Sequence, residues 1–478
     1  MGLLRTESWP GNPAAPRAID RRPGTFRAYV PHRLTGWHPL LPADVAAFVA
    51  DAERQLVATA SVLAPDSASV SMFFWAESLG SSRIEGVTPQ ARRVVHALIA
   101  EASPSPPRRR GHVGEVIGNI EATAKSLRIL AQPAALTVEL LCDAHRVLMN
   151  SSPNPGLGGA LKTTQNWIGG NDWHPLDGDF VPPPPDECRP LMEDLVAYLR
   201  TGNHSPVMQA VAAHAQFETI HPFGDGNGRA GRALLYAALK HRCASEGFMP
   251  PVSLALSQNR GAYLRSLAAY QSYIGAPDDV RRSAAAIPLA EVVSTAVNQS
   301  CDAASSYAVA ISRLQDRWRE RVGQRTGRSA ALAAVNLLAS QPSLTPEILA
   351  SESGFSPRRC ADALRRLTEA GITRSRRVGP RLRAYDADRI FEMYDVMSST
   401  MGDPHSARQL LGQIAGVPFL PTNDSDDFSG AVESVDLGAQ WERCPLRVRS
   451  TGRRCGLEAG HRGHCRAIPQ RRHPPRTR

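Results

Sequence analysis

The chain has 478 residues, of which 42% are hydrophobic, and carries a formal net charge of +10. This length is enough for two to four domains that each bury a core, and no run of 18 apolar residues predicts a membrane span. Residues 441–478 hold eleven arginines against two glutamates, so the whole-chain charge does not predict nucleic-acid binding by the rest of the protein. Eight scattered cysteines favour a reducing compartment such as the cytoplasm over a disulfide framework.

Residues 1–40 are interrupted by prolines and predict an extended arm. Helical spacing begins at residues 41–63. Five residues of this helix form an expected apolar stripe: Val45, Phe48, Val49, Leu56 and Val57. Further helices over 67–86 and 88–102 complete an N-terminal helical region, residues 41–110.

Residues 111–275 continue the helical pattern and predict the core of the protein. Helices are expected over 114–130, 136–150, 186–199 and 207–220, and the last should place its apolar residues on one face. Before the third of these helices, residues 161–185 change to short β-prone runs around Gly169 and Gly170. This change is a hairpin signal.

The densest cluster of functional residue types is HPFGDGNGRAGR, residues 221–232. Gly224, Gly226 and Gly228 allow positive φ, which lets backbone N–H groups turn inward and form an anion site. The apolar run from Ala233 predicts a helix that starts near Asn227, whose dipole adds to the attraction for anions. The stretch therefore predicts a phosphate site.

The charged side chains of this stretch fit the same chemistry. Asp225 is placed to hold Mg²⁺. Arg229 and Arg232 are three residues apart, hence on one face of the predicted helix, where two guanidinium groups can hold a polyphosphate. His221 is the one group that titrates near neutrality and is a candidate general base.

Two other interpretations fit the sequence of residues 221–232. Gly226, Gly228 and Gly231 spell GxGxxG, the dinucleotide fingerprint, but this fingerprint needs a preceding strand, and residues 207–220 have helical spacing. We therefore reject a Rossmann fold. The remaining alternative is a Gly-rich connection between two core helices, with solvated charges.

At every defined position the stretch resembles the Fic family signature, HPFx(D/E)GNGRxxR. The resemblance implies a mainly α-helical domain that transfers AMP from ATP to the hydroxyl of a Ser, Thr or Tyr. It also implies that His221 takes the proton of the attacking hydroxyl and that Asp225 holds Mg²⁺. The residues that it implies to contact phosphate are Gly226, Asn227, Gly228, Arg229 and Arg232.

The segment SSRIEG extends this resemblance upstream of the core. It places Ser81 and Glu85 in the defined positions of the inhibitory motif of Fic proteins, (S/T)xxxE(G/N). The motif implies a self-inhibited class of enzyme, in which the Glu85 carboxylate pairs with Arg232 and occupies the donor for the γ-phosphate. The alternative is a plain helix end closed by Gly86.

Residues 161–185 resemble the Fic flap, a hairpin that holds a target segment by strand pairing. This makes Trp167 and Ile168 the expected target-facing residues, with a simple surface hairpin as the alternative. The family usually has Arg where Lys162 stands, so Lys162 is assigned no role. Tyr263 lies in the region that covers the nucleotide in the family, and a core tyrosine is an equal expectation.

Residues 276–325 predict a helical bridge, and residues 326–400 predict three short helices followed by two β-prone arms. This order is that of a winged helix-turn-helix, which some Fic proteins carry at this place. Its arginines are Arg358, Arg359, Arg365 and Arg366 on the expected recognition helix, with Arg374, Arg376, Arg377, Arg381 and Arg383 on the wing. They favour contact with duplex DNA, and contact with a protein is the alternative.

The last two segments are an acidic linker, residues 401–440, and a basic tail, residues 441–478. The tail offers zinc ligands, namely Cys444, Cys455, Cys465 and either His461 or His464. Their spacing matches no standard zinc finger, and a disordered tail is the alternative.

The sequence as a whole predicts a self-inhibited, Mg²⁺-dependent protein adenylyltransferase. Its fold is expected to be mainly α, with a Fic helical core, a β-hairpin flap and a C-terminal winged helix-turn-helix. The alternatives are a DNA-binding regulator whose core senses nucleotide, and a Fic-type enzyme that moves another phosphate-containing group or removes AMP. An intact His221 argues against the sensor, because a sensor needs no base. A homodimer is left open.

Overall fold

The computed structural model describes residues 2–63, 70–101, 111–201, 204–243, 249–323, 329–379 and 382–416. The mainly helical fold expected from the sequence is confirmed. Its first helices are α1 (Ala43–Val62), α2 (Val70–Ile84), α3 (Ala91–Glu101), α4 (Gly111–Leu130), α5 (Val138–Met149), α6 (Pro185–Thr201), α7 (Pro206–Ile220) and α8 (Asn227–Cys243). The later helices are α9 (Val252–Gln258), α10 (Arg260–Gln271), α11 (Asp279–Arg321), α12 (Ala330–Leu338), α13 (Pro346–Ser353), α14 (Pro357–Glu369), α15 (Asp388–Ser399) and α16 (Pro404–Ala415). Among the described residues, no helix is both long and apolar enough to cross a bilayer.

The centre of the core is α7, which packs against α1, α6, α8 and α11. Every residue of α7 after Pro206 is buried, so burial extends beyond the apolar face expected from the spacing to all sides of the helix. Four alanines in the helix allow neighbouring helices to approach closely on several sides. Because α7 is held on all sides, the loop that follows its last residue starts from a fixed point.

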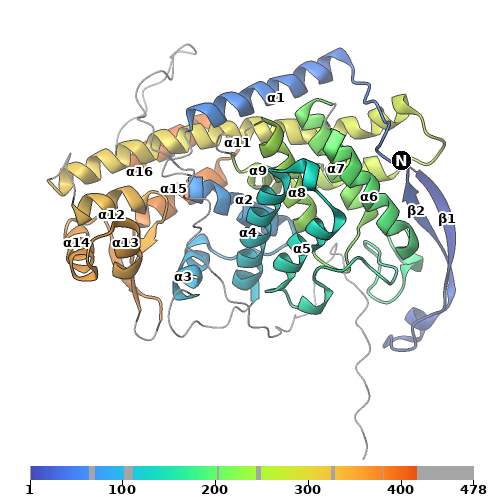
Figure 1. Ribbon diagram of the computed structural model, residues 1–478, viewed down its shortest axis with the longest axis horizontal. Coiled ribbons are helices and arrows are strands. Elements are labelled where there is room, and N and C mark those ends of the chain that lie inside the picture. Colours follow the sequence, from blue (N-terminus) through green and yellow to red (C-terminus); the bar gives the residue numbers. More distant parts are fainter. Residues whose placement is uncertain are drawn as a thin grey trace, which may run out of the picture.

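Two long helices cover this core. The 43-residue α11 runs along the length of the molecule beside α1 (Figure 1). The stripe predicted for α1 is only partly buried, because Val45, Val49 and Leu56 are inside while Phe48 and Val57 are 36% and 47% exposed.

The first 40 residues, for which an extended arm is predicted, contain a two-stranded ribbon. Strand β1 (Gly2–Trp9) pairs antiparallel with β2 (Gly24–Pro31), with Trp9 opposite Gly24. Most of the prolines that suggested an arm fall in the connection between the strands, where they remove no ladder hydrogen bond. The ribbon packs on the segment that precedes α6, in an apolar cluster that contains Phe26, Ala28, Trp167 and Val181.

The three short helices and two strands expected near the C-terminus are present as α12, α13, α14, β4 (Arg374–Arg377) and β5 (Arg383–Asp386). A short strand β3 (Ser343–Leu344) completes an antiparallel sheet in the order β3-β5-β4. Helices α12, α13 and α14 begin at the caps Ser329, Thr345 and Ser356, whose hydroxyls accept a backbone N–H of the first turn.

Two helices follow where none was expected. The prediction that a linker begins at residue 401 is wrong for its first part, because α16 occupies Pro404–Ala415. Asp403 caps this helix by accepting from the N–H of Ser406, and Leu411 is buried beside α11. The rest of the acidic segment and the four candidate zinc ligands lie outside the described residues.

Candidate active site

The predicted phosphate loop joins two buried helices, α7 and α8, and α8 begins at Asn227 as expected. His221 ends α7 in a left-handed conformation, with φ 50° and ψ 59°. Of the three glycines expected to take positive φ, only Gly226 does so, with φ 77°. Gly224 and Gly228 therefore do not contribute a left-handed backbone conformation to the loop.

The His221 ring is buried and neutral. Burial, and then the nearby Lys162 ammonium, lower the pKa of His221 to about 3. Nδ1 lies 3.3 Å from the carbonyl oxygen of Glu218, which assigns the ring proton to Nδ1. Nε2 makes no hydrogen bond among the described residues. The lone pair that a general base uses is therefore available at physiological pH.

Two polar side chains brace the loop from inside. The Asn227 side chain accepts the N–H of Phe223 at 2.9 Å and donates to its carbonyl at 2.8 Å. His145 stacks on the Phe223 ring with centroids 3.7 Å apart, and its Nε2 lies 2.8 Å from the carbonyl oxygen of Asp225. The expectation that Asn227 binds phosphate is thus not met by its side chain, which holds the loop in shape.

Asp225 is half-buried at the edge of the loop. Its carboxylate accepts from the N–H of Gly226 at 2.7 Å and from the amide of Asn154 at 3.2 Å. The described residues contain no cluster of three or more His, Cys, Asp or Glu that could hold a metal. A single carboxylate fits Mg²⁺ that takes its other ligands from substrate phosphates and water.

Arg232 is fully buried and is held by the end of α2. Its Nε donates to Ser81 Oγ at 3.0 Å, and its Nη2 donates to the Ser81 carbonyl at 2.9 Å. The same Nη2 donates to Glu85 Oε1 at 2.7 Å. Arg260 fixes the turn by donating to the carbonyl of Ile84 at 2.7 Å. The contact between Glu85 and Arg232 that the resemblance implies is therefore present.

The Glu85 carboxylate also covers the first turn of α8. A Cβ atom at Gly228 would overlap Oε1 of Glu85, so only glycine permits this approach. The N-terminal turn of a helix presents backbone N–H groups and a positive dipole end, which is where an anion binds. Glu85 thus occupies the place predicted for a phosphate group.

Arg229 turns toward a different carboxylate. Its Nη1 lies 3.4 Å from Oε2 of Glu115 on α4, and both side chains are buried. Arg229 and Arg232, which are predicted to hold a polyphosphate together, therefore each contact a carboxylate in this conformation. Glu115 of α4 is the partner of Arg229, and Glu85 in the turn after α2 is the partner of Arg232.

Two more carboxyl groups lie in the electrostatic surroundings of Arg232. Burial raises the pKa of both Glu77 and Glu218 to about 7, and the Arg232 charge partly opposes this rise. Glu77 accepts the N–H of Ser253 at 2.7 Å, whereas Oε1 of Glu218 makes no hydrogen bond among the described residues. Arg232 is therefore a cation with several potential anionic partners, of which Glu85 makes the shortest contact.

The segment expected to be a flap differs from the prediction. Ile168 and Phe180 form a single antiparallel bridge that closes a longer loop, in place of a regular hairpin. Trp167 is 4% exposed and meets Trp9 of β1 edge to face, with ring centroids 5.8 Å apart. Trp167 is therefore an anchor for the ribbon rather than a target-facing residue, and only Ile168 is partly exposed.

Tyr263 is a core residue. It is fully buried, and its hydroxyl lies 2.8 Å from Nε2 of His214 on α7. The expected nucleotide contact is therefore not available to it here. Its hydroxyl links α10 to the core behind Arg232, because the other nitrogen of His214 bonds to the carbonyl of Gly231.

Several site residues were missed by sequence reasoning, namely Glu115, His145, Asn154, Lys162, Asn166 and Glu218. Glu218 lies one helical turn before His221, so its place near the site follows from spacing. The others come from α4, α5 and two loops, and the sequence carries no local signal for their approach.

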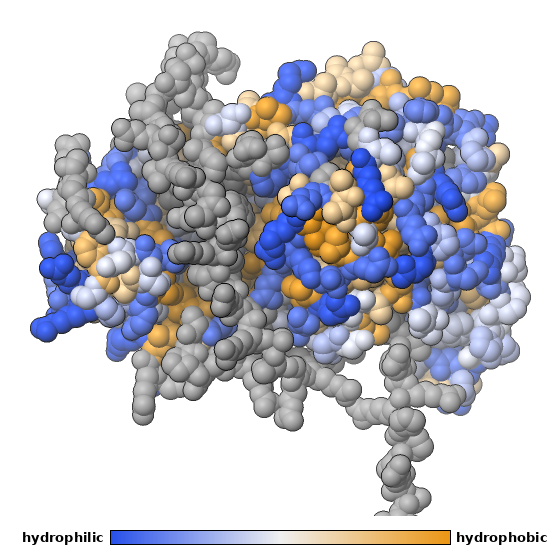
Figure 2. Space-filling model, viewed as in Figure 1, coloured by the Kyte–Doolittle hydropathy of each residue, from blue (hydrophilic) through white to orange (hydrophobic). Residues whose placement is uncertain are grey.

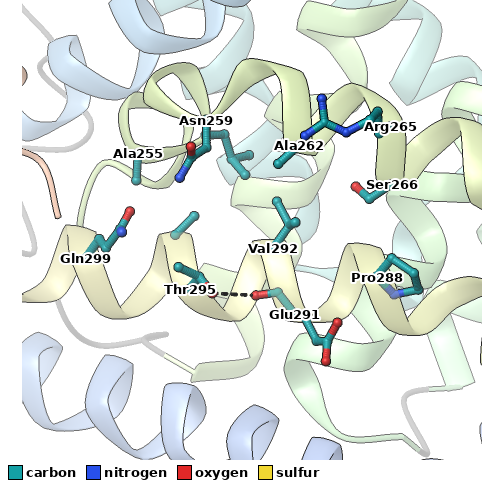
Figure 3. Close-up of a pocket in the computed structure, with 12 residues that line it drawn as sticks. Ala255, Asn259, Ala262, Arg265, Ser266, Pro288, Glu291, Val292, Thr295 and Gln299 are labelled. Atoms are coloured by element: carbon teal, nitrogen blue, oxygen red, sulfur yellow. Dashed lines mark hydrogen bonds between the residues drawn. The ribbon is translucent and has the colours of Figure 1, made fainter.

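A cavity of about 400 Å³ lies elsewhere, between α9, α10 and α11 (Figure 3). Its lining includes Asn259, Ser266, Thr295 and Gln299, and none of residues 221–232. The phosphate loop is therefore not part of this cavity.

Comparison with known proteins agrees with the site. Residues 135–239 match the model of the Fic/DOC family. These residues form a domain of the Fic/DOC family. The chain is 30% identical over 135 residues to protein adenylyltransferase fic-1 of Caenorhabditis elegans, and 31% identical over 137 residues to protein adenylyltransferase Fic of Drosophila erecta. Each match covers 28% of this chain, with 23% and 25% of the respective relatives.

The chain thus spans about a quarter of the length of these relatives. A solved Fic family protein from Desulfovibrio desulfuricans aligns with a TM-score of 0.44 and 21% identity, over 73% of this chain and 98% of that one. The Fic domain contains His221, Asp225 and Arg232, whereas Ser81 lies in α2 and Glu85 in the turn that follows α2, both before the matched region. The carboxylate that occupies Arg232 is therefore supplied from outside the family domain.

Proposed function

We propose that this protein is a Mg²⁺-dependent adenylyltransferase that transfers AMP from ATP to a Ser, Thr or Tyr hydroxyl of a protein. The observation that carries the proposal is the neutral His221 ring, whose Nε2 is unbonded among the described residues, beside an anion-binding helix start. The adenylyltransferase names of the relatives support the same chemistry.

In the proposed reaction, Nε2 of His221 accepts the proton of the attacking hydroxyl. The hydroxyl oxygen forms a bond to the α-phosphorus of ATP, and the bond to the bridging oxygen breaks, so pyrophosphate leaves. Arg232 and the N–H groups at the start of α8 hold the phosphates beyond the α-phosphate. Asp225 would supply the protein ligand to Mg²⁺, and the bound ion would neutralise the charge that develops on the pyrophosphate.

We also propose that Glu85 inhibits this reaction. A carboxylate and a phosphate cannot both occupy the same guanidinium and the same helix start. While Glu85 is bound, the terminal phosphates of ATP are excluded from Arg232, and the α-phosphorus is out of line with His221. Movement of the α2 end is therefore the activating step.

Labelled ATP tests the proposed chemistry. Protein incubated with α-³²P-ATP and Mg²⁺ is expected to become labelled, on itself or on a lysate protein, whereas γ-³²P-ATP should leave no label. Label from the γ-position instead would make the protein a phosphotransferase. Failure of both labels to transfer, for the Glu85→Gly variant as well as the wild type, would support the nucleotide sensor. Release of AMP from an AMP-modified protein would support the reverse reaction.

We propose duplex DNA as a second ligand, bound by residues 329–386. On α14, Arg358, Arg359, Arg365 and Arg366 are exposed. Figure 2 shows hydrophilic residues at the outer edge of this end of the molecule, beside hydrophobic ones. The wing contributes less than expected, because Arg374 and Arg376 pair with Asp388 and Arg376 also pairs with Asp386. Contact through α14 is therefore favoured over contact through β4.

Salt titration of the full-length protein on a duplex tests this assignment. Replacing both Arg358 and Arg366 by Glu should lower the slope of log K against log salt by about 2, since each lost phosphate contact removes about one unit. Arg54→Glu, an exposed arginine on α1, is the matched control and should leave the slope unchanged. A wild-type protein that shifts no duplex even at low salt would make the module a protein-contact surface.

A further inference from the structure

Four consecutive backbone carbonyls around the candidate base all accept hydrogen bonds from the same two residues. Lys162 and Asn166 lie in the segment between α5 and α6, about sixty positions before the loop. Lys162 donates from Nζ to the carbonyl of Ile220 at 3.0 Å and from its backbone N–H to the carbonyl of Pro222 at 2.8 Å. Asn166 donates from Nδ2 to the carbonyls of His221 and Phe223, at 3.1 and 2.9 Å. No other pair of residues contacts this stretch of backbone so completely among the described residues.

The orientation of the two side chains is fixed by a bond between them. Lys162 Nζ donates to Asn166 Oδ1 at 2.9 Å. An ammonium group only donates, so the Asn166 oxygen must face it and the amide NH₂ must face the carbonyls. Both side chains are buried, at 6% and 4% exposure. A buried lysine is costly unless its hydrogen bonds are satisfied, and here the loop carbonyls help to satisfy them.

The backbone that they hold is under strain. His221 is the only non-glycine residue with positive φ among the described residues. A residue with a large side chain keeps such a conformation only where its surroundings impose it. The N–H of His221 is fixed by the carbonyl of Phe217 at 2.9 Å, as at many helix ends, but its carbonyl side is fixed by Asn166.

We propose that Lys162 and Asn166 are positioning residues that hold His221 left-handed, so that Nε2 faces the hydroxyl to be modified. The inference rests on the proposed AMP transfer and extends it to residues outside the signature. Lys162 has a second effect on the base, because its charge disfavours the protonated ring. The other charged group that acts on His221 is Glu85, in the turn after α2, whose effect is opposite.

The test uses full-length protein with Glu85→Gly as the parent, which removes the inhibitory contact. Lys162→Met keeps the length of the side chain and removes its N–H donors and charge. It is expected to lower kcat by about tenfold or more, because small displacements of a catalytic group are that costly, while the Kd for ATP stays within about twofold. Lys162→Arg should retain kcat within about threefold of the parent. Lys125→Met, on the surface of α4, is the matched control.

Hydrogen exchange gives a readout that does not need activity. Backbone amides of residues 221 and 223–227 should exchange at least about tenfold faster in Lys162→Met than in Lys125→Met. Asn166→Leu, which removes the amide donors but keeps the Lys162 charge, should give the same increase and the same fall in kcat. Unchanged exchange and unchanged kcat in folded Lys162→Met and Asn166→Leu would overturn the inference. A parent that transfers no AMP would instead refute the proposed function, and the exchange rates would still decide the inference.

Discussion

Replacement of His221 by alanine is expected to lower the rate of AMP transfer by on the order of 10² to 10⁴, the usual contribution of a general base. The ATP affinity should change by less than about twofold. Among the described residues, the His221 ring bonds to the carbonyl of Glu218 and to none of the groups proposed to bind phosphate. Both quantities are best measured in the Glu85→Gly background, with α-³²P-ATP for transfer and calorimetry for binding.

The matched control is His112→Ala, which removes an exposed histidine from the start of α4. It should leave transfer unchanged. If His221→Ala transfers AMP as fast as its parent, the base must be another group, and the proposed mechanism is wrong. If instead ATP affinity falls in parallel with transfer, the ring supports the nucleotide site and not the proton transfer.

Replacement of Glu85 by glycine is expected to raise AMP transfer by about tenfold to a hundredfold. The wild-type carboxylate is hydrogen-bonded at 2.7 Å to an arginine that is 2% exposed, while Glu85 itself is 29% exposed. A charge-assisted bond of this kind is worth about 1.5–3 kcal/mol, and each 1.4 kcal/mol corresponds to a factor of ten in rate. The gain should appear mainly as a lower half-saturating ATP concentration.

A double-variant cycle identifies Arg232 as the group that Glu85 blocks. Arg232→Ala added to Glu85→Gly should cancel the gain, because no guanidinium then remains for the phosphate. Glu85→Gln keeps the size of the side chain and removes its charge, so its transfer rate should lie between those of the wild type and Glu85→Gly. Equal transfer by wild type and Glu85→Gly would mean that the turn after α2 is only a helix end.

The parts of the site that sequence reasoning predicted are those with local causes. The start of α8 at Asn227 follows from the glycines before it and the apolar run after it. The helical character of α7 follows from its spacing, which also excluded a Rossmann fold. The contact between Glu85 and Arg232 joins positions 147 apart, and it was expected only because the two segments resembled a known family.

Several of the errors concern long-range contacts. Arg229 meets Glu115, which lies 114 positions away, and no periodicity reports such a pairing. Trp167 was assigned to the surface because its partners, Trp9 and Phe26, belong to a ribbon that looked unpaired in the sequence. Lys162 was given no role because it departs from the family, yet its donors meet carbonyls near His221.

Glu85 and the site that it occupies belong to the same chain, and this would determine how the enzyme responds to conditions in the cell. An inhibitory group on the same chain acts at an effective concentration, which is on the order of millimolar for a flexible tether and does not fall when the protein is diluted. If Glu85 inhibits as proposed, dilution of the enzyme would leave its resting activity per molecule unchanged. The activity would then depend on the concentration of free nucleotide relative to the effective concentration of the Glu85 carboxylate. It would also depend on any contact that loosens the turn between Ile84 and Gly86.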